Sequence, residues 1–217
     1  FRAPLRPTLP EVSNTSWSRN PIDRFVLERL EHEGLSPSPE VGRPTLLRRL
    51  SLDLIGLPPT PEEISRFLAD EAPDQVAFQR VVDRLLKSPH YGERWGRHWL
   101  DVIGYTESDG FEHDKFRPHS WRYRDYVVSS FNDGLPYDEV GRQQLAGDVL
   151  PNPSRKSIAA TGFLVSGEWD EVQHVGSSKS EMRRAREEEL AEMIGTVSGT
   201  FLGLTVHCCR CHDHKFD

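Results

Sequence analysis

The stretch Thr60-Pro61-Glu62-Glu63-Ile64-Ser65-Arg66-Phe67-Leu68 predicts a helix from its own chemistry. A threonine can cap the first turn, proline is favoured at the first helical position, and Glu63 stands where a capping box requires an acid. Ile64, Phe67 and Leu68 then recur at the spacing of one buried helix face. This stretch therefore sets the pattern to look for in the rest of the chain.

The same three-to-four-residue apolar spacing recurs along most of the sequence. Strand signals are scarce, because no Asn-Gly or Asp-Gly pair stands between alternating apolar runs. Asp109-Gly110, for example, has no such runs on either side. The fold class is therefore predicted to be mainly α, with at most a minor two-stranded element. The expected helical ranges are 22–30, 46–55, 60–68, 74–87, 90–103, 120–131, 138–145, 157–165 and 187–206.

Composition divides the chain into a short lead-in and one large domain. Residues 1–20 are rich in proline, serine and threonine and are expected to be extended, whereas 21–217 is predicted to form a single irregular helical domain. A polar loop is expected at 106–118, and a flexible surface loop rich in serine and glycine at 166–180. Because the sequence stops six residues after its last cysteine, we expect it to be a fragment of a larger multidomain protein.

The overall balance of residues excludes two classes of partner. Of the 217 residues, 36% are hydrophobic and 28% charged, which is typical of a globular protein. The formal net charge of −7 disfavours a general nucleic-acid surface. No apolar run reaches the roughly 18 residues of a membrane span. No signal peptide precedes Phe1, whose segment looks already processed, so its absence does not argue against export.

All three cysteines lie within four positions, which indicates a cofactor or metal rather than a set of structural disulfides. Cys208 and Cys211 are followed directly by His212, in the pattern that attaches a c-type haem. Two thiols at this spacing can reach the two vinyl groups of one porphyrin, and the histidine can bind the iron as proximal ligand. Cys209 lies between these two cysteines and is not expected to take part in haem attachment.

Two other interpretations of the same segment stay open. A zinc site could use Cys208, Cys211, His212 and His214, although four ligands within seven residues are cramped for a tetrahedron. A redox disulfide between the two outer cysteines is the second alternative, but no thioredoxin-like strand and helix precede it.

The closing string Cys211-His212-Asp213-His214-Lys215-Phe216-Asp217, preceded by Gly203-Leu204-Thr205-Val206, resembles the signature of a planctomycete-type domain family of unknown function. The similarity extends over roughly residues 20–217. Further matching segments occur in order: Arg48-Arg49-Leu50-Ser51-Leu52-Asp53-Leu54-Ile55-Gly56-Leu57-Pro58-Pro59, Tyr91-Gly92-Glu93-Arg94-Trp95, His98-Trp99-Leu100-Asp101, Trp121-Arg122-Tyr123-Arg124-Asp125, Gln144-Leu145-Ala146-Gly147-Asp148 and Ala160-Thr161-Gly162-Phe163.

The resemblance implies a domain found beside cytochrome c modules in large exported proteins, and therefore a periplasmic or extracellular location. It implies no known reaction. The chain departs from the family pattern at His207 and Cys209, where small residues are expected, and at Ile103-Gly104-Tyr105-Thr106, which replaces an Arg-Tyr-Ala run.

A haem needs further partners, and three residues are candidates. His98, flanked by tryptophans on its predicted helix, is the first candidate for a distal iron ligand, although an ordinary half-buried histidine would look the same. Arg122 and Arg124 could bind the propionates, since guanidinium groups suit carboxylates, although surface ion pairs explain them equally well.

The loop after the predicted helix at 90–103 carries four carboxylates in eight residues. Such a cluster could bind Ca²⁺ near a cavity, although its spacing is not that of an EF-hand and a solvated acidic loop gives the same pattern. The four residues are Glu107, Asp109, Glu112 and Asp114.

Three functions follow from these features, in order of preference. The first is electron transfer by a covalent haem c, with redox partner domains in a larger assembly. The second is an extracytoplasmic enzyme, either a haem enzyme with an open distal site or a hydrolase of extracellular polymers. The third is a structural domain with a cysteine or metal staple. The sequence alone leaves open whether the domain is catalytic.

Overall fold

The computed structural model describes residues 3–171, 174 and 178–214. Contacts divide the chain into two compact units, residues 1–45 and 46–217, each of which is described by itself. The proposed boundary between a lead-in at 1–20 and a domain at 21–217 stays a prediction.

The first unit contains one helix, α1 (Pro21–His32). Its start is a capping box in which the Asn20 side chain accepts the N–H of Asp23 and the Asp23 carboxylate accepts the N–H of Asn20. The extended segment before it is tied to the helix, because Ser13 donates its N–H to Glu31 at 3.0 Å. Leu27 is the buried apolar residue of this helix.

Three helices open the second unit: α2 (Arg43–Leu54), whose first residues belong to the unit before it, α3 (Pro61–Leu68) and α4 (Asp74–Leu86). Leu47, Phe67 and Ala77, one from each helix, bury a small core between them. The capping box predicted for α3 is confirmed, since Thr60 Oγ1 accepts the Glu63 N–H at 3.2 Å and Glu63 accepts the Thr60 N–H at 2.9 Å.

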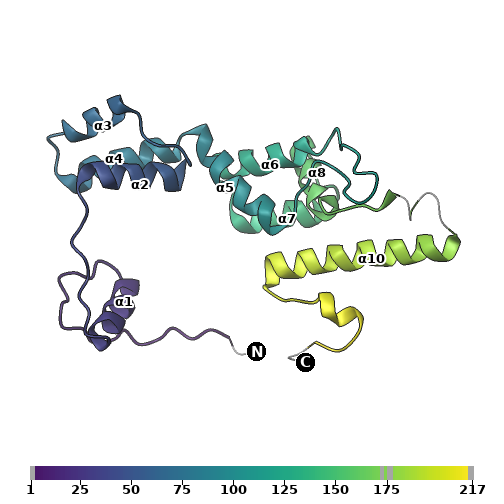
Figure 1. Ribbon diagram of the computed structural model, residues 1–217, viewed down its shortest axis with the longest axis horizontal. Coiled ribbons are helices and arrows are strands. Elements are labelled where there is room, and N and C mark those ends of the chain that lie inside the picture. Colours follow the sequence, from purple (N-terminus) through teal and green to yellow (C-terminus); the bar gives the residue numbers. More distant parts are fainter. Residues whose placement is uncertain (1–2, 172–173, 175–177, 215–217) are drawn as a thin grey trace. The chain divides into compact units, whose positions relative to one another are not determined.

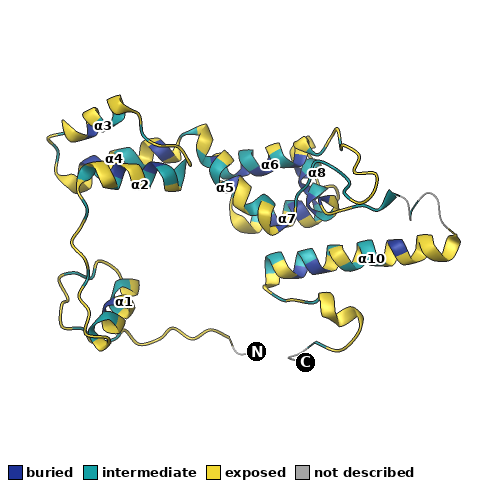
Figure 2. Cartoon of the chain, in the orientation of Figure 1, coloured by how far each residue is buried: buried dark blue, intermediate teal, exposed yellow. Residues whose placement is uncertain are grey.

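The larger core lies among α5 (Pro89–Val102), α6 (Trp121–Asn132), α7 (Tyr137–Ala146), α8 (Arg155–Ala160) and the 3₁₀ helix η1 (Thr161–Val165). These elements lie together in Figure 1, and Figure 2 shows their buried sides facing one another. The fully buried apolar residues of this core are Ile103, Tyr123, Tyr126, Val127, Ala160 and Phe163.

The chain closes with α10 (Lys179–Val197), the π turn η2 (Ser198–Leu202) and the 3₁₀ turn η3 (His207–Arg210). The expected range of 187–206 was wrong at both ends. The helix starts earlier because Ser178 and Glu181 form a capping box. It stops early because the π turn follows and Gly203 adopts a left-handed conformation with φ of 65°.

Asp109-Gly110 is part of a short hairpin, the minor two-stranded element that the sequence allowed, although the pair lacks alternating apolar runs on either side. Arg117 donates its N–H to Glu107 O at 2.8 Å, and Asp109 donates to Lys115 O at 2.9 Å. A single antiparallel bridge joins Ser108 and Phe116 between these bonds. We call residues 107–117 the hairpin. Its pairing is too short to produce the alternating apolar runs by which hairpins are predicted.

The prediction of a mainly α fold is confirmed: within the described ranges the ordered elements are helices, and pairing between extended segments is limited to the hairpin bridge. Among those same residues, no helix has both the length and the apolar composition that crossing a membrane requires.

Candidate functional site

The cysteine–histidine segment forms a single helical turn. Cys209 donates its N–H to Val206 O at 2.9 Å, and both Cys211 and His212 donate theirs to Cys208 O, at 3.1 and 3.3 Å. Residues three and four positions apart share one side of such a turn. Cys208, Cys211 and His212 therefore lie on a common face. We call residues 207–212 the cysteine turn.

The imidazole of His212 is oriented by its own backbone. Its Nδ1 lies 2.8 Å from the carbonyl oxygen of Asp213, a distance at which Nδ1–H donates to that oxygen. In this tautomer Nε2 carries the lone pair and is the ring atom available to a metal. The side chain is exposed, so the lone pair is accessible.

The opposite side of the cysteine turn rests on α10. The ring of His207 lies directly on Gly195, where an added Cβ would stand only 1.9 Å from His207 Cε1. Two carboxylates of α10 face the same turn, Glu192 at 3.8 Å from His207 and Glu188 at 3.7 Å from Arg210. His207 and Arg210 thus fix the turn, while the thiol face is directed elsewhere.

All three thiols are free and exposed. Among residues 3–171, 174 and 178–214, no three histidine, cysteine or acidic side chains gather closely enough to hold a metal ion. The common face of the turn therefore offers two accessible thiols and one oriented imidazole. The zinc alternative stays untested. Lys215, Phe216 and Asp217 of the closing signature lie outside the described residues.

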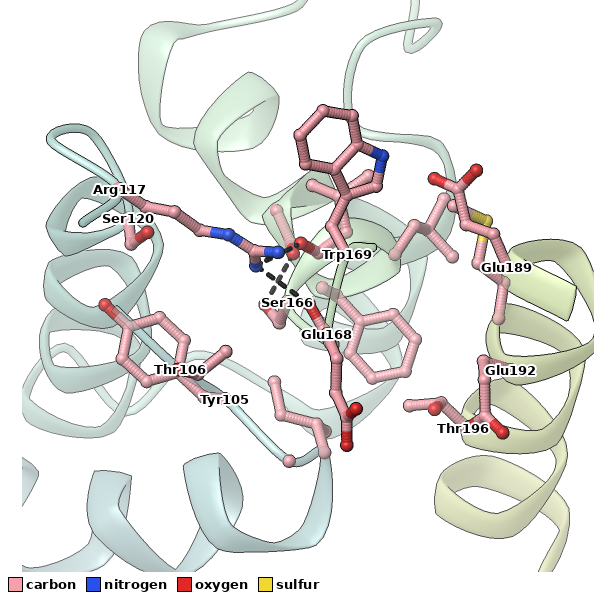
Figure 3. Close-up of a pocket in the computed structure, with 18 of the residues that line it drawn as sticks. Tyr105, Thr106, Arg117, Ser120, Ser166, Glu168, Trp169, Glu189, Glu192 and Thr196 are labelled. Carbon is pink, nitrogen blue, oxygen red and sulfur yellow. Dashed lines mark hydrogen bonds between the residues drawn. The ribbon is translucent and has the colours of Figure 1, made fainter. Parts of the chain in front are cut away.

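A large cavity adjoins the cysteine turn. It has a volume of about 1230 Å³, and His207 and Arg210 form part of its lining, whereas Cys208, Cys211 and His212 do not. The other walls are the segment from Val102 to Tyr123, residues 158–170 with His174, and the inward side of α10. Figure 3 shows side chains from all three walls around the same space.

One wall of the cavity is held together by hydrogen bonds between the hairpin and residues 165–171, which we call the strap. Arg117 pairs with Asp109 at 2.6 Å and donates to the carbonyls of Val165 and Gly167 at 3.3 and 2.8 Å. Trp169 donates its N–H to Asp109 O at 2.9 Å. The side chains of Arg117 and Asp109 are only 18% and 15% exposed, so this ion pair is shielded from solvent.

The tip of the hairpin is tied to the strap a second time, through Glu171. Its carboxylate accepts from Lys115 at 2.6 Å and lies 2.9 Å from His113 Nδ1. These two partners, Lys115 first, hold the pKa of Glu171 below its ordinary value. Through these contacts of Glu171 the hairpin and the strap form one wall.

Phe111 presents its ring at the cavity in a backbone conformation that is unusual for phenylalanine. Its φ is 55°, and the ring is 53% exposed. Left-handed backbone costs a non-glycine residue roughly 1–2 kcal/mol. Little packing compensates this cost, so the residue is strained in place, as residues at binding sites often are.

We expect Phe111→Gly to raise the free energy of unfolding by about 0.5–1 kcal/mol, because glycine adopts positive φ without strain. Phe116→Gly is the matched control, since Phe116 is in the bridged part of the hairpin and is still more exposed. That change should lower stability by a similar amount. Urea denaturation measures both, and equal losses from the two changes would contradict the assignment of strain to Phe111.

Of the residues predicted to serve a haem, Arg122 lines the cavity and lies over the Trp121 ring at 5.4 Å. Arg124 instead pairs with Glu107 at 2.5 Å. His98 is exposed, contacts Trp95 edge-on and does not line the cavity. The distal ligand and propionate roles stay predictions.

The four carboxylates predicted to bind calcium are not gathered into one site. Glu107 accepts from Arg124 and from the Tyr105 hydroxyl, Asp109 pairs with Arg117, and Asp114 accepts the Gly110 N–H at 3.0 Å. Glu112 is exposed. Burial, together with the neighbouring Glu107 carboxylate, raises the pKa of Tyr105 to about 12. A calcium role for the loop stays a prediction.

Several cavity residues were not singled out from the sequence, namely Phe111, Arg117, Glu168, Trp169 and Glu189. They come from three segments that are distant along the chain, and no local pattern joins them. The one available signal was Asp109-Gly110, a turn pair that would have marked the hairpin.

Comparison with known proteins gives one result. The family PSCyt2, described as "Protein of unknown function (DUF1549)", matches residues 21–217. No curated protein and no solved structure matches the chain significantly.

Proposed function

The chain belongs to the PSCyt2 family (DUF1549), and on that premise we propose that it is an exported domain that carries one covalent c-type haem and transfers electrons within a larger multidomain protein. The observation that carries this proposal is the cysteine turn. It offers two free thiols and an oriented imidazole on one accessible face.

The donor set of the cysteine turn fits a haem. Cys208 and Cys211 would each add S–H across one vinyl group of the porphyrin, which forms two thioethers without a net change in oxidation state. His212 would offer Nε2 to the iron, and the carbonyl of Asp213 would keep its ring in the required tautomer. The bound group would supply a one-electron couple.

The accessibility of this face supports electron transfer. The thiols and His212 are exposed, and His207 and Arg210 hold the turn on α10 from its other side. The residues that would hold a haem are therefore exposed to a neighbouring redox domain. We therefore propose that the partner is a redox module of the same assembly and that the location is periplasmic or extracellular.

The proposal predicts that acid–acetone extraction leaves the haem on the polypeptide, because thioethers survive denaturation. The protein should be produced with export and a cytochrome c maturation system, and the covalent haem measured by intact mass and by the pyridine haemochrome spectrum. Cys208→Ala combined with Cys211→Ala should reduce the covalent haem to background.

Cys209→Ala is the matched control, since it removes a thiol of the same turn that has no part in attachment. This variant should retain full haem. Equal loss in Cys209→Ala, a colourless wild-type chain, or stoichiometric zinc in place of iron would reject the proposal. A six-coordinate low-spin spectrum would agree with electron transfer, whereas five-coordinate high-spin iron would favour a haem enzyme.

A further inference from the structure

We propose that the cavity between the hairpin, the strap and α10 is a binding site for a neutral or basic oligosaccharide. This inference does not depend on the haem, because Cys208, Cys211 and His212 are absent from the cavity lining. It rests on the size of the cavity, on the kinds of groups that line it, and on how firmly its wall is built.

The size of the cavity exceeds what a small metabolite needs. Its volume of about 1230 Å³ lies above the 300–1,000 Å³ that is usual for small-molecule sites. The α10 residues that line the space run from Ala185 to Thr196, about 16 Å along the helix at 1.5 Å per residue. A ligand of several linked rings would fill such a space, whereas a single small molecule would leave most of it to water.

Aromatic rings and polar groups both line this space. Phe111 and Phe116 are exposed at the cavity, and Trp169 lines it with its indole stacked on His174 at 5.3 Å. Flat aromatic faces suit the apolar faces of pyranose rings, while carboxylates and guanidinium groups suit pairs of hydroxyls. Sugars present both kinds of surface at once.

Charge selects among sugars. The carboxylates lining the cavity outnumber its arginines, six to three. Three of these acids pair with arginines, Asp109 with Arg117, Glu188 with Arg210 and Glu189 with Arg186. The excess that remains would repel an anionic glycan, so the expected ligand is neutral or carries amino groups. The acids are Asp109, Glu168, Asp170, Glu188, Glu189 and Glu192, and the arginines are Arg117, Arg122 and Arg210.

The position of the carboxylates brings them to the ligand from two sides. Glu168 extends from the strap into the space that separates it from Glu192 of α10, and Glu189 stands on the same helix (Figure 3). The strap itself is fixed, because Arg117 binds the carbonyls on either side of Ser166. The wall that carries Glu168 and Trp169 is therefore formed before a ligand arrives, which lowers the entropy lost on binding.

The test is titration of the whole chain with soluble four- to six-unit oligosaccharides of glucose, mannose, xylose, N-acetylglucosamine and glucosamine, followed by calorimetry and tryptophan fluorescence. At least one member should bind with a dissociation constant below about 1 mM, and oligogalacturonate should bind at least tenfold more weakly. Phe111→Gly should weaken the affinity for the sugar that binds about tenfold, although the folded state of this variant is expected to be more stable. Glu168→Gln should weaken it roughly three- to tenfold.

Glu187→Gln is the matched control, because Glu187 is an exposed carboxylate of α10 outside the cavity lining. It should leave the affinity unchanged. The inference is overturned if no sugar of the set binds at 10 mM, or if oligogalacturonate binds as well as neutral sugars. Unchanged affinity in both Phe111→Gly and Glu168→Gln would overturn it too. So would saturable binding of tetramethylammonium in the absence of binding by any sugar, because the cavity would then be a site for organic cations. None of these results bears on covalent haem, which is measured separately.

Discussion

Gly92→Ala is expected to destabilise the protein by about 3 kcal/mol or more, because the helices α5 and α6 meet at this residue with no room for a side chain. A Cβ at position 92 would lie 2.3 Å from the carbonyl oxygen of Val128 and 2.7 Å from the Asn132 amide. The Val128 oxygen is a backbone atom, so it can move away from the added Cβ only if α6 itself moves. Overpacking of this kind costs about 1–3 kcal/mol even where side chains can adjust.

A second loss adds to the clash. Gly92 donates its N–H to Asn132 Oδ1 at 2.8 Å, and Asn132 donates to Pro89 O at 3.0 Å, so one amide satisfies backbone groups in the first turn of α5. Displacing α6 would break both bonds. For a chain of this length the melting temperature should fall by about 6–12 °C.

Gly96→Ala is the control for this prediction, since it makes the same change one turn further along α5. A Cβ there would stand 3.4 Å from the nearest atoms, the methyl groups of Val127 and Val128. Alanine is also a better helix former than glycine by roughly 1 kcal/mol. Thermal and urea denaturation should therefore show little change or a small gain. Equal destabilisation by both changes would contradict the prediction, because the cost would then not come from the specific clash of a Cβ at position 92 with Val128 and Asn132.

The helices were largely predictable because their signals are local. A capping box needs four residues and an apolar stripe needs ten, which is why α3 was predicted within its first turn. The same signal at Ser178 and Glu181 was present but lay at the end of a stretch rich in serine and glycine. The expectation of a loop there hid the true start of α10.

The cavity could not be predicted, because its walls are brought together only by the fold. Arg117 fixes the strap through the backbone carbonyls of Val165 and Gly167. Every residue has such a carbonyl, so the sequence does not indicate which ones bind an arginine. The cysteine turn was the opposite case: its residue pattern was plain in the sequence. What the structure added is its orientation, with His207 rather than the thiols directed to α10.

The family resemblance rested on several short segments, and the structure gives many of their residues packing roles. Gly92 of α5 packs directly against Val128 and Asn132 of α6, and a Cβ at Gly162 would stand 2.8 Å from Cβ of Tyr123. Trp99, Tyr123 and Gln144, each from a different segment, meet in one buried hydrogen-bond network. These residues of the segments therefore contribute to the assembly of α5 to α8 and η1.

The network of Trp99, Tyr123 and Gln144 is centred on the amide oxygen of Gln144, and the Trp99 N–H also donates to the Tyr123 hydroxyl at 3.2 Å. Gln144 Oε1 receives the Tyr123 hydroxyl at 2.5 Å and the Trp99 indole N–H at 2.9 Å, while its amide nitrogen donates to Val140 O at 3.3 Å. Gln144 is 0% exposed and Tyr123 4% exposed, so water cannot replace the amide. Burial also raises the pKa of Tyr123 well above its ordinary value, which keeps the hydroxyl protonated as a donor.

Gln144→Met is accordingly expected to cost about 2 kcal/mol, although methionine closely matches glutamine in length and shape. The change leaves the buried Tyr123 hydroxyl without an acceptor, which costs about 1–3 kcal/mol, whereas the Trp99 N–H keeps its bond to that hydroxyl at 3.2 Å. Gln143→Met is the control, because it makes the same substitution one position earlier on α7, where the half-buried amide binds only Glu139 at 2.9 Å. That change should cost less than about 1 kcal/mol in urea denaturation. Equal losses from Gln144→Met and Gln143→Met would show that the buried acceptor adds nothing beyond packing.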